Sequence, residues 1–552
     1  MPDREQIRLH ALKNAYQHGG KADPKAVLSK VLAESPDLRK SAKDLLPVVN
    51  EVVEEVNSLG AAEIEEILRK EHPEALIAEK KEQRHGLPDL PGVTGKVVMR
   101  MAPSPSGPLH VGHSRMAILN DEYVRKYGGE LILRIEDTNP KNIDPSAYQQ
   151  IPRDLAWLGV QFTSVVVQSD RMELYYDEAR RLIRNGGMYV CSCGVQEFKE
   201  KRQKGIACPH RSLSARENEE RFQEMLDGGF REGEAVAVVK TDLAHPNPSV
   251  RDWIAFRIIE REHPRQGRKY RVYPMMNFSV AVDDHHLGLT HVIRGKDHLN
   301  NTEKQKYIFR YNDWPLPVYF HYGLIHIPNT VLKTSTIKKG IADGSYSGWD
   351  DVRLGTILAL RKRGYVPATF RRYWIESGLR ESDAEFSWDI FNAMNKDSID
   401  AATPRGFFVP DPVMLKVEGL PECDVTIPNH PTNKSLGTRK YRMSASRGVY
   451  VDASDLAQVP DGKAFRLKDF CNVVKRGHRL EFAGFELREK GIRIVQWAPE
   501  PAIDLTVHMP DGRRITGKAE QALGSVDGTV QLERFGYARV LGIEGQAFFL
   551  HR

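Results

Sequence analysis

The sequence predicts a multidomain α/β protein, and three observations support this fold class. First, its 552 residues exceed what one hydrophobic core accommodates, so we expect roughly three or four domains. Second, an apolar strand, a loop rich in Gly, Pro and Ser, a helix and a second strand follow one another between residues 96 and 137. Third, short β-type runs alternate with Gly, Pro and Asp turns from Pro404 onward, as in barrels or sandwiches.

The composition is that of an ordinary globular protein. Hydrophobic residues make up 40% and charged residues 28% of the chain, and no segment approaches the ~20 apolar residues of a membrane span. The first ten residues, MPDREQIRLH, lack the apolar stretch of a secretory signal. We therefore expect a cytoplasmic protein without a membrane partner. The formal charge of +6 permits a polyanionic partner but does not require one.

Apolar spacing and turn residues divide the chain into predicted segments. Residues 1–86 are expected to form a helical appendage, because apolar residues such as Val27, Leu28 and Val31 recur three to four positions apart. A Gly/Pro-rich linker at 85–95 follows. The remaining boundaries are 96–180 and 266–345 for the two halves of an α/β domain, 181–265 for an insertion, 346–403 for a helical stem and 404–552 for the β-rich region. Within 271–294 we expect strands around a turn at VAVDD.

The turn Pro-Leu-His-Val-Gly-His at 108–113 indicates nucleotide binding. His110 and His113 share one face of the predicted helix Val111–Tyr127, and Gly112 would let an adenine ring lie close to the backbone. Amides at a helix N-terminus attract phosphate oxygens, to which the two imidazoles can also donate hydrogen bonds. An isolated His-x-Gly-His would instead favour surface or metal-binding histidines, but the strand and the Pro-Ser-Pro-Ser-Gly in front favour the nucleotide.

A second motif has the spacing of a metal site. It consists of Cys-x-Cys, fourteen residues and Cys-x-His, formed by Cys191, Cys193, Cys208 and His210. Three thiolates and one imidazole suit structural Zn²⁺, and a closed set without an open position predicts no catalytic role. The alternative, four incidental residues, fits the paired spacing less well. The remaining cysteines, Cys423 and Cys471, are expected to be ordinary buried thiols.

These motifs resemble a known family. The stretch RMAPSPSGPLHVGH (100–113) looks like the signature of class I aminoacyl-tRNA synthetases, specifically the glutamyl and glutaminyl branch. LRIEDTNP (133–140) and YPMMNFSVAVDDHHLGLTHVIRGKDH (273–298) are similar to further signatures of that branch. The resemblance implies a Rossmann-like class I catalytic domain that uses ATP and Mg²⁺, and a zinc-bearing insertion that contacts the acceptor end of tRNA. It extends from about residue 90 to the end, and more weakly over the helical part.

The resemblance also implies the amino-acid substrate. Glu136 would hold the α-ammonium group, Arg294 and Arg100 would bind carboxylates, and Ser104 would line the substrate site. Two guanidinium groups match the two carboxylates of glutamate, because arginine binds carboxylate bidentately. Glutamine would leave a buried guanidinium unpaired, at a cost of roughly a few kcal/mol. Without the resemblance, Glu136 would be interpreted as a surface acid beside Arg134.

The sequence departs from the family pattern at two places. Met276 stands where many relatives have tyrosine, so side-chain recognition would depend more on the arginines. The segment NTVLKTSTIKKGI (329–341) occupies the position of the mobile Lys-Met-Ser-Lys-Ser loop without its pattern. We expect Lys333 and Ser335 to act there, with Lys338 and Lys339 as alternatives, by neutralising the departing pyrophosphate. Alone, this segment would be a solvated basic loop.

The last third mixes basic and aromatic residues, as in RKYRMSASRGVYV, AFRLKDFCNVVKRGHR and VQLERFGYARV. Basic side chains position phosphates and aromatic rings stack on unpaired bases, although any basic β domain could have this composition. The region resembles the double β-barrel anticodon-binding region of archaeal-type glutamyl and of glutaminyl synthetases. The implied activity is ligation of glutamate to tRNA(Glu). Some resembling enzymes also charge tRNA(Gln), which an amidotransferase then corrects. Two alternatives stay open: a glutaminyl-tRNA synthetase and a non-catalytic tRNA-binding paralogue.

Overall fold

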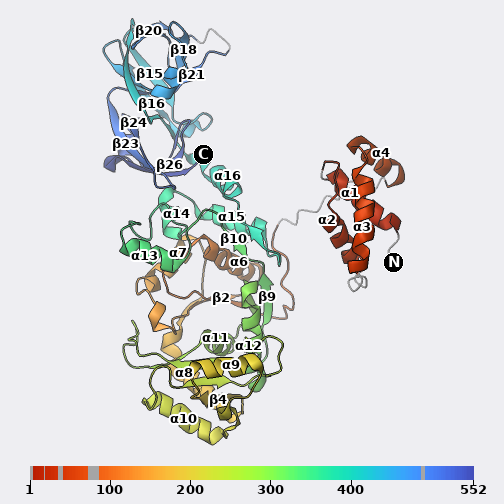
Figure 1. Cartoon of the computed structure of the whole chain (residues 1–552). Coiled ribbons are helices and arrows are strands. Elements are labelled where there is room, and N and C mark those ends of the chain that lie inside the picture. The colour runs from red at the N-terminus through yellow and green to blue at the C-terminus, as the bar shows by residue number, and fades with distance from the viewer. Residues whose placement is uncertain (1–3, 18, 35–41, 73–85, 487–490) are drawn as a thin grey trace. The chain divides into compact units, whose positions relative to one another are not determined.

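The computed structural model describes residues 4–17, 19–34, 42–72, 86–486 and 491–552 (Figure 1). The chain divides into two compact units, residues 1–85 and residues 86–552. Residues 73–85, with the end of the predicted appendage and the first residue of the predicted linker, lie outside the described part.

The first unit contains a bundle of helices: α1 (Arg4–Gln17), α2 (Pro24–Glu34), α3 (Ala42–Asn57) and α4 (Ala61–Glu71). Helix α3 buries Val49, Val52 and Val56, which its 3.6-residue period brings to one face. Ile64 and Leu68 of α4 are buried in the same core. The helical appendage that the apolar spacing predicts is therefore confirmed.

The second unit begins with parallel strands: β1 (Val98–Met101), β2 (Glu130–Ile135), β3 (Ser164–Val167), β8 (His291–Gly295) and β9 (Val318–Tyr322). β1 pairs with β2, β2 with β3 and β8 with β9, each time in parallel. The amide of Thr290 donates to the carbonyl of Val98 at 3.0 Å, which brings β8 beside β1. In a layer of this kind the loops at the carboxyl ends of the strands form the ligand crevice.

Four helices accompany these strands: α6 (Val111–Tyr127), α7 (Ala147–Trp157), α11 (Met276–His286) and α12 (Leu299–Tyr311). The predicted order of strand, loop, helix and strand is confirmed by β1, α6 and β2. The predicted turn at VAVDD is wrong, because this segment lies inside α11. Phe278 and Val282 of α11 pack into the core, and Asp283 is buried among polar partners, so tertiary contacts override the β propensity of the valines.

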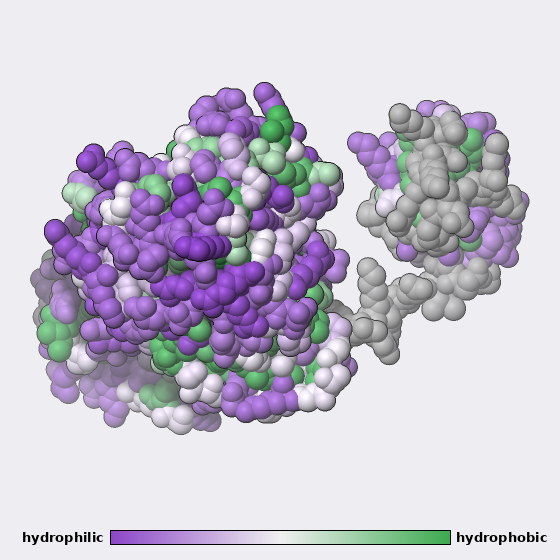
Figure 2. All heavy atoms as spheres, turned by 90° about the horizontal axis from the view of Figure 1, so that it is seen from below, coloured by the Kyte–Doolittle hydropathy of each residue, from purple (hydrophilic) through white to green (hydrophobic). Residues whose placement is uncertain are grey.

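An antiparallel sheet of β4 (Met188–Cys191), β5 (Val236–Val239), β6 (Trp253–Ile258) and β7 (Val272–Pro274) lies with α8 (Met172–Arg184), α9 (Val195–Lys204) and α10 (Ala215–Asp227). Phe222 of α10 and Phe256 of β6 contact each other in its core, with ring centroids 5.5 Å apart. Figure 2 views the molecule from the side of these helices and shows a mainly hydrophilic face. None of the described helices is both long and apolar enough to cross a membrane.

A helical segment follows, with α13 (Thr334–Ala342), α14 (Ile357–Arg363), α15 (Pro367–Ser377) and α16 (Trp388–Ile399), and the short strands β10 (Ile325–His326) and β11 (Ala384–Glu385). The indole Nε1 of Trp374 donates to Ser114 Oγ of α6 at 2.7 Å. The guanidinium of Arg363 donates to the carbonyl of Leu550 near the C-terminus at 2.7 Å. These helices therefore contact both the parallel layer and the end of the chain.

The last third forms two seven-stranded sheets and a hairpin of β15 (Cys423–Pro428) and β16 (Thr438–Met443). One sheet contains, in spatial order, β12 (Arg405–Gly406), β25 (Asp527–Leu532), β26 (Gly536–Leu541), β27 (Gln546–His551), β23 (Ala502–His508), β24 (Arg514–Glu520) and β13 (Phe408–Val409). The other contains β21 (Ile494–Val495), β18 (Ala464–Leu467), β19 (Asn472–Arg476), β20 (Arg479–Gly484), β14 (Pro412–Glu418), β17 (Gly448–Asp452) and β22 (Trp497–Pro499).

The edge strands of each sheet are neighbours in the sequence. β12 and β13 are separated by Phe407 alone, and β21 and β22 by Gln496 alone. The first and last strands of each sheet therefore lie close together, so each sheet curls toward a barrel. The predicted C-terminal barrels are confirmed. Cys471 is buried and Cys423 half-buried, both as free thiols.

A buried carboxylate joins the two barrels. Glu520 at the end of β24 accepts hydrogen bonds from the amide of Phe407 at 2.9 Å, from Arg439 Nε at 2.8 Å and from the Tyr441 hydroxyl. Burial raises the pKa of Glu520, and the adjacent Arg439 guanidinium opposes that rise. Arg439 and Tyr441 belong to β16, so this ion pair connects two regions that have separate hydrophobic cores.

We expect Glu520→Gln to destabilise the chain by roughly 3 kcal/mol, because it leaves the buried Arg439 guanidinium with only the Glu533 carboxylate, 3.9 Å away. Urea unfolding followed by tryptophan fluorescence measures the change. As a matched control, Asp504→Asn removes an 89% exposed carboxylate from the pair with Lys518 and should have little effect. Equal losses in the two variants would contradict this account.

Candidate functional site

The turn at 108–113 is ordered by its own histidines. His110 caps the N-terminus of α6, and its Nδ1 accepts from the amide of Gly112 at 3.1 Å. His113 Nδ1 accepts in turn from the amide of His110 at 3.3 Å, and the two rings stack with centroids 3.6 Å apart. Desolvation by the surrounding protein lowers the pKa of His110 to about 2 and that of His113 to about 4. Both rings are therefore neutral at pH 7, and with Nδ1 accepting, each carries its proton on Nε2.

Backbone contacts hold this turn from both sides. The amide of Leu109 donates to the Asp154 carboxylate at 3.1 Å, and the carbonyl of Leu109 accepts from the amide of Ile357 at 2.8 Å. Burial raises the pKa of Asp154 to about 6. A Cβ atom on Gly112 would lie 3.0 Å from Cε1 of His110, so the capping ring itself requires glycine. The two imidazole N–H groups therefore lie beside the N-terminus of α6.

The Pro/Ser/Gly loop after β1 lies beside the lysine segment. Gly107 has no room for a larger side chain, because a Cβ atom would lie 3.0 Å from the Trp349 ring and 3.2 Å from the Thr334 methyl group. Thr334 is the first residue of α13, which Lys333 precedes as N-cap. The structure thus brings the N-terminus of α13 to the loop that contains Ser104, which is exposed.

The predicted lysine-loop residues differ in their contacts. Lys333 and Ser335 are exposed at the N-terminus of α13. Lys338 Nζ lies 3.8 Å from the Asp144 carboxylate, and Asp144 in turn donates its amide to the carbonyl of Pro105 in the Pro/Ser/Gly loop at 2.8 Å. Lys339 is exposed farther along the helix. Of the four, Lys333 and Ser335 remain the residues at the helix start, where phosphate charge would be attracted.

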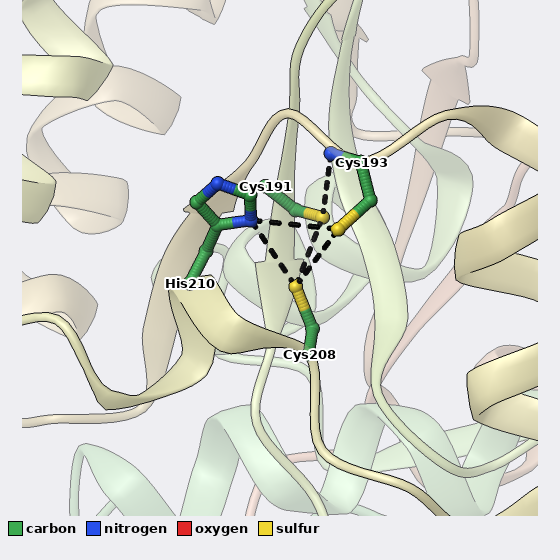
Figure 3. A group of neighbouring side chains, drawn as sticks. All are labelled: Cys191, Cys193, Cys208 and His210. Atoms are coloured by element: carbon green, nitrogen blue, oxygen red, sulfur yellow. Dashed lines mark hydrogen bonds between the residues drawn. The ribbon is translucent and has the colours of Figure 1, made fainter.

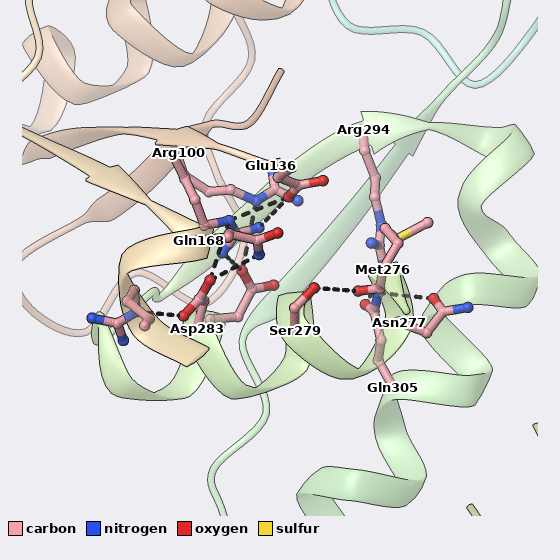
Figure 4. A network of polar contacts seen from close by, with 12 residues as sticks. Arg100, Glu136, Gln168, Met276, Asn277, Ser279, Asp283, Arg294 and Gln305 are labelled. Atoms are coloured by element: carbon pink, nitrogen blue, oxygen red, sulfur yellow. Dashed lines mark hydrogen bonds and ion pairs between the residues drawn. The ribbon is translucent and has the colours of Figure 1, made fainter. Parts of the chain in front are cut away.

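The substrate residues Arg100 and Glu136 belong to a buried ionic cluster centred on Arg134 (Figure 4). Arg134 Nη1 donates to Asp284 at 2.6 Å, and Arg134 Nη2 donates to Glu136 Oε1 at 2.9 Å. Arg100 Nε lies 3.6 Å from Asp284 and is buried without a hydrogen-bond partner among the described residues. Burial raises the pKa of Glu136, and the two guanidinium groups oppose this. The contacts of Glu136 to Arg134 use one oxygen of its carboxylate.

Asp283 is a further member of this cluster. It accepts hydrogen bonds from Gln168 at 2.9 Å, from Arg171 at 2.8 Å and from the Tyr175 hydroxyl at 2.7 Å. The guanidinium groups of the cluster and its surroundings outnumber the carboxylates: they are Arg100, Arg134, Arg171 and Arg294 against Glu136, Asp283 and Asp284. The excess positive charge suits a ligand with a net negative charge.

Arg294, at the carboxyl end of β8, differs from Arg134 in its partners. It is 4% exposed, yet no described carboxylate lies within ion-pair distance of it. Its Nη2 donates to Thr302 Oγ1 at 2.5 Å and to Gln305 Oε1 at 2.9 Å, and its Nε has no hydrogen-bond partner in the described part of the chain. Burial lowers the pKa of Arg294 to about 10, aided by Arg100, so the side chain stays charged at pH 7. Met276 is half-buried at the start of α11, in the same region (Figure 4).

Sequence reasoning missed the roles of several residues in this cluster. In the sequence, Arg134 stands out only as a neighbour of Glu136, and Asp283 and Asp284 only as turn residues. Two adjacent acids at the end of an apolar run were the available signal, because acids buried inside a protein need cationic partners. Gln305 and Thr302 carried no sequence signal, since their importance comes from Arg294, eight to eleven positions earlier in the chain.

The predicted metal ligands lie together in the antiparallel-sheet region (Figure 3). The sulfur of Cys208 lies 3.3 Å from that of Cys191, 3.4 Å from that of Cys193 and 3.3 Å from His210 Nδ1. All four ligand atoms are within 4.8 Å of one another. The other ring nitrogen of His210, Nε2, lies 3.1 Å from Ser192 Oγ, which would fix the ring as an outer hydrogen bond does in metal sites. The donor set and its compactness fit a tetrahedral Zn²⁺ ion.

Comparisons with known proteins agree with these observations. Residues 96–401 match the catalytic domain of the class I tRNA synthetases (E and Q), and residues 403–483 match their anticodon-binding domain. The glutamate–tRNA ligase of Thermoplasma volcanium is 54% identical over 99% of both chains. That of Thermoplasma acidophilum is 57% identical over 91% of both chains. A solved glutamate tRNA ligase from Elizabethkingia meningosepticum has a TM-score of 0.42 and 20% identity, over 55% of this chain and 70% of that one.

We expect Arg134→Met to destabilise the fold by about 3–5 kcal/mol at pH 8, because Asp284 and Glu136 lose their buried cation. Without it, the pKa of Glu136, which burial already raises in the parent, rises further above its unfolded value. Ionisation then opposes folding, so the destabilisation should grow as the pH rises and be smaller at pH 5. The difference between the unfolding midpoints of parent and variant, recorded from pH 5 to pH 8, measures this destabilisation.

The matched control is Arg216→Met, whose guanidinium is 89% exposed beside Glu220. It should change the midpoint little and without a pH trend. A loss in Arg134→Met that is the same at pH 5 and pH 8 would show that uncompensated carboxylates are not its cause.

Proposed function

The chain belongs to the class I tRNA synthetases specific for glutamate and glutamine, and on this premise we propose that it ligates glutamate to tRNA. The observation that carries the choice of glutamate is Arg294, a buried guanidinium without a described carboxylate partner. Leaving such a charge uncompensated is costly, and a ligand carboxylate offsets the cost. The neutral amide of glutamine would not offset this cost. The names of the Thermoplasma relatives agree with this choice.

Three groups match the three charges of glutamate in this proposal. Arg294 and Arg100 bind the two carboxylates, each with an Nε group that has no acceptor among the residues that the structure describes. Glu136 holds the α-ammonium group through the oxygen that Arg134 does not engage. Ser104 lines the approach, and Met276 contributes an apolar contact where relatives of the branch have a tyrosine. The excess positive charge of the cluster supports a substrate of net charge −1.

The reaction then proceeds in two steps without a protein nucleophile. A glutamate carboxylate oxygen attacks the α-phosphorus of ATP, and pyrophosphate leaves. A ribose hydroxyl of the terminal adenosine of tRNA next attacks the carbonyl carbon, AMP leaves, and the hydroxyl proton passes to solvent. His110 and His113 donate from Nε2 to the phosphates over Gly112, while Lys333 and Ser335 receive the pyrophosphate. Mg²⁺ supplies further neutralisation of phosphate charge when bound. Positioning and electrostatics account for the rate.

We further propose that Cys191, Cys193, Cys208 and His210 hold a structural Zn²⁺ ion. A bound ion would fix the chain between β4 and α10, where the family places contacts with the acceptor end of tRNA.

The C-terminal barrels would bind the anticodon region of tRNA(Glu). The resemblance to archaeal-type enzymes extends the proposal to tRNA(Gln), with an amidotransferase as a further partner. Because translation consumes the product, we place the protein in the cytoplasm.

Charging assays with purified tRNA(Glu) and tRNA(Gln) side by side test the function. We expect glutamate to be attached to tRNA(Glu) with a kcat/KM at least about a hundredfold above that for glutamine, because the amide leaves Arg294 unpaired. Glutamate attached to tRNA(Gln) would support the wider partner range. Arg294→Met should remove most of the preference for glutamate.

Two outcomes would overturn the proposed function. Charging with glutamine but not glutamate would identify a glutaminyl-tRNA synthetase. No ATP–pyrophosphate exchange at high protein concentration with tRNA present would identify a non-catalytic tRNA-binding paralogue.

The zinc proposal predicts one zinc ion per purified chain by elemental analysis. Cys208→Ser should lose the metal and lower the unfolding temperature, because metal binding contributes directly to folding of the site. Cys423→Ser, in the C-terminal region, is the matched control and should retain one zinc per chain. A parent chain without zinc, or equal zinc content in both variants, would contradict the assignment.

A further inference from the structure

Two buried arginines of the site, Arg134 and Arg294, are held by chemically different partners. Arg134 is held by the carboxylates of Asp284 and Glu136, which neutralise its charge. Arg294 is held by the hydroxyl of Thr302 and the amide oxygen of Gln305, which are neutral. In a buried environment this difference is large, because charges are poorly screened there. Neutral acceptors orient a guanidinium and leave its charge for a ligand.

The acceptors of Arg294 come from one face of α12. Thr302 and Gln305 are three residues apart, so they lie next to each other on the helix, and both are buried. Their two bonds use both protons of Nη2. The protons of Nε and Nη1 are thereby left for a ligand, and among the described residues Nε has no acceptor.

A directed chain of amides fixes the orientation of Gln305, and Figure 4 shows its first member, Asn277, beside Gln305. Gln305 Nε2 donates to Asn277 Oδ1 at 3.1 Å, and Asn277 Nδ2 donates to Asn301 Oδ1 at 3.1 Å. Asn301 Nδ2 lies 3.0 Å from His298 Nδ1, which ends the chain with an acceptor. Every amide therefore turns its oxygen toward Arg294 and its NH₂ group away. A reversed Gln305 amide would place donor against donor.

We propose that Gln305, oriented by Asn277, is a positioning residue that holds Arg294 without neutralising it and thereby sets the preference for a carboxylate over a carboxamide substrate. This inference rests on the proposed function, since it concerns the discrimination between glutamate and glutamine. Gln305 acts through Arg294 and is assigned no contact with the substrate. Replacing its amide by a carboxylate would convert Arg294 into a neutralised arginine like Arg134.

Two substitutions separate orientation from charge. Gln305→Met removes the acceptor, and we expect the KM for glutamate to rise about tenfold as Arg294 loses one of its two anchors. Gln305→Glu keeps an acceptor of the same shape but adds a negative charge. We expect its KM for glutamate to rise about a hundredfold and its preference for glutamate over glutamine to fall at least about tenfold. The assay is ATP–pyrophosphate exchange by the full chain with tRNA present.

Three readouts distinguish positioning from a general structural defect. The KM for ATP should stay within about twofold of the parent, because the nucleotide turn at 108–113 does not depend on Gln305. Glu303→Gln, an equally small change on the same helix at a residue that pairs with Lys306, should leave all constants unchanged. Thr302→Val removes the other acceptor with little change of shape and should raise the KM for glutamate about tenfold. Thr302→Val therefore tests the inference even if the Gln305 variants do not fold.

The outcomes separate this inference from the proposed function. Folded Gln305 and Thr302 variants with a KM for glutamate within about twofold of the parent would overturn the inference alone. Equal rises in the KM values for glutamate and ATP would also overturn it, because they indicate a general defect. A parent chain inactive with glutamate would instead overturn the proposed function.

Discussion

Arg134 has a fully buried side chain, and its charge is tolerated there only because carboxylates surround it. Its partners are Glu136, which directly follows β2, and Asp284 of α11, far away in the sequence. The same Asp284 that binds Arg134 also faces Arg100 on β1. This ion cluster therefore ties two neighbouring strands to one helix, and the proposed position of Glu136 toward a substrate depends on it.

The contrast between Arg134 and Arg294 explains how the site keeps an unbalanced charge. An arginine that only supports structure is best surrounded by carboxylates, whereas an arginine that binds an anion must be held by groups that leave its charge intact. Hydroxyl and amide oxygens meet this requirement. The helix N-termini beside the Pro/Ser/Gly loop apply the same rule to phosphate, because backbone amides attract anions without carrying a net charge.

Features encoded by nearby residues were predictable from the sequence. The helix after the turn at 108–113 begins and ends at the predicted residues, Val111 and Tyr127, because its cap and its terminating glycine are local. The cysteines and His210 converge as predicted, because their paired spacing folds over a short stretch of chain. The regular turns predicted a β-rich terminal region of barrels or sandwiches, and the family resemblance predicted the barrels.

Features that depend on contacts distant in sequence were not predictable. The VAVDD segment has valines typical of strands, yet it is helical because its aspartates meet partners such as Arg134 and Tyr175, more than a hundred residues earlier in the chain. The acceptors of Arg294 were not predictable for the same reason. A glutamine and a threonine on a helix indicate no function until the fold brings β8 beside them. Which oxygen of Glu136 is occupied follows from such contacts as well.

The edge strands of the two terminal sheets are only two or three residues long, and in each sheet they adjoin in sequence. A long free edge would offer unpaired amides and carbonyls to any other chain with β character. Edge strands of two or three residues present few such groups. Their shortness thus acts as protection against fibril growth by strand addition, in the region of the chain that is richest in β structure.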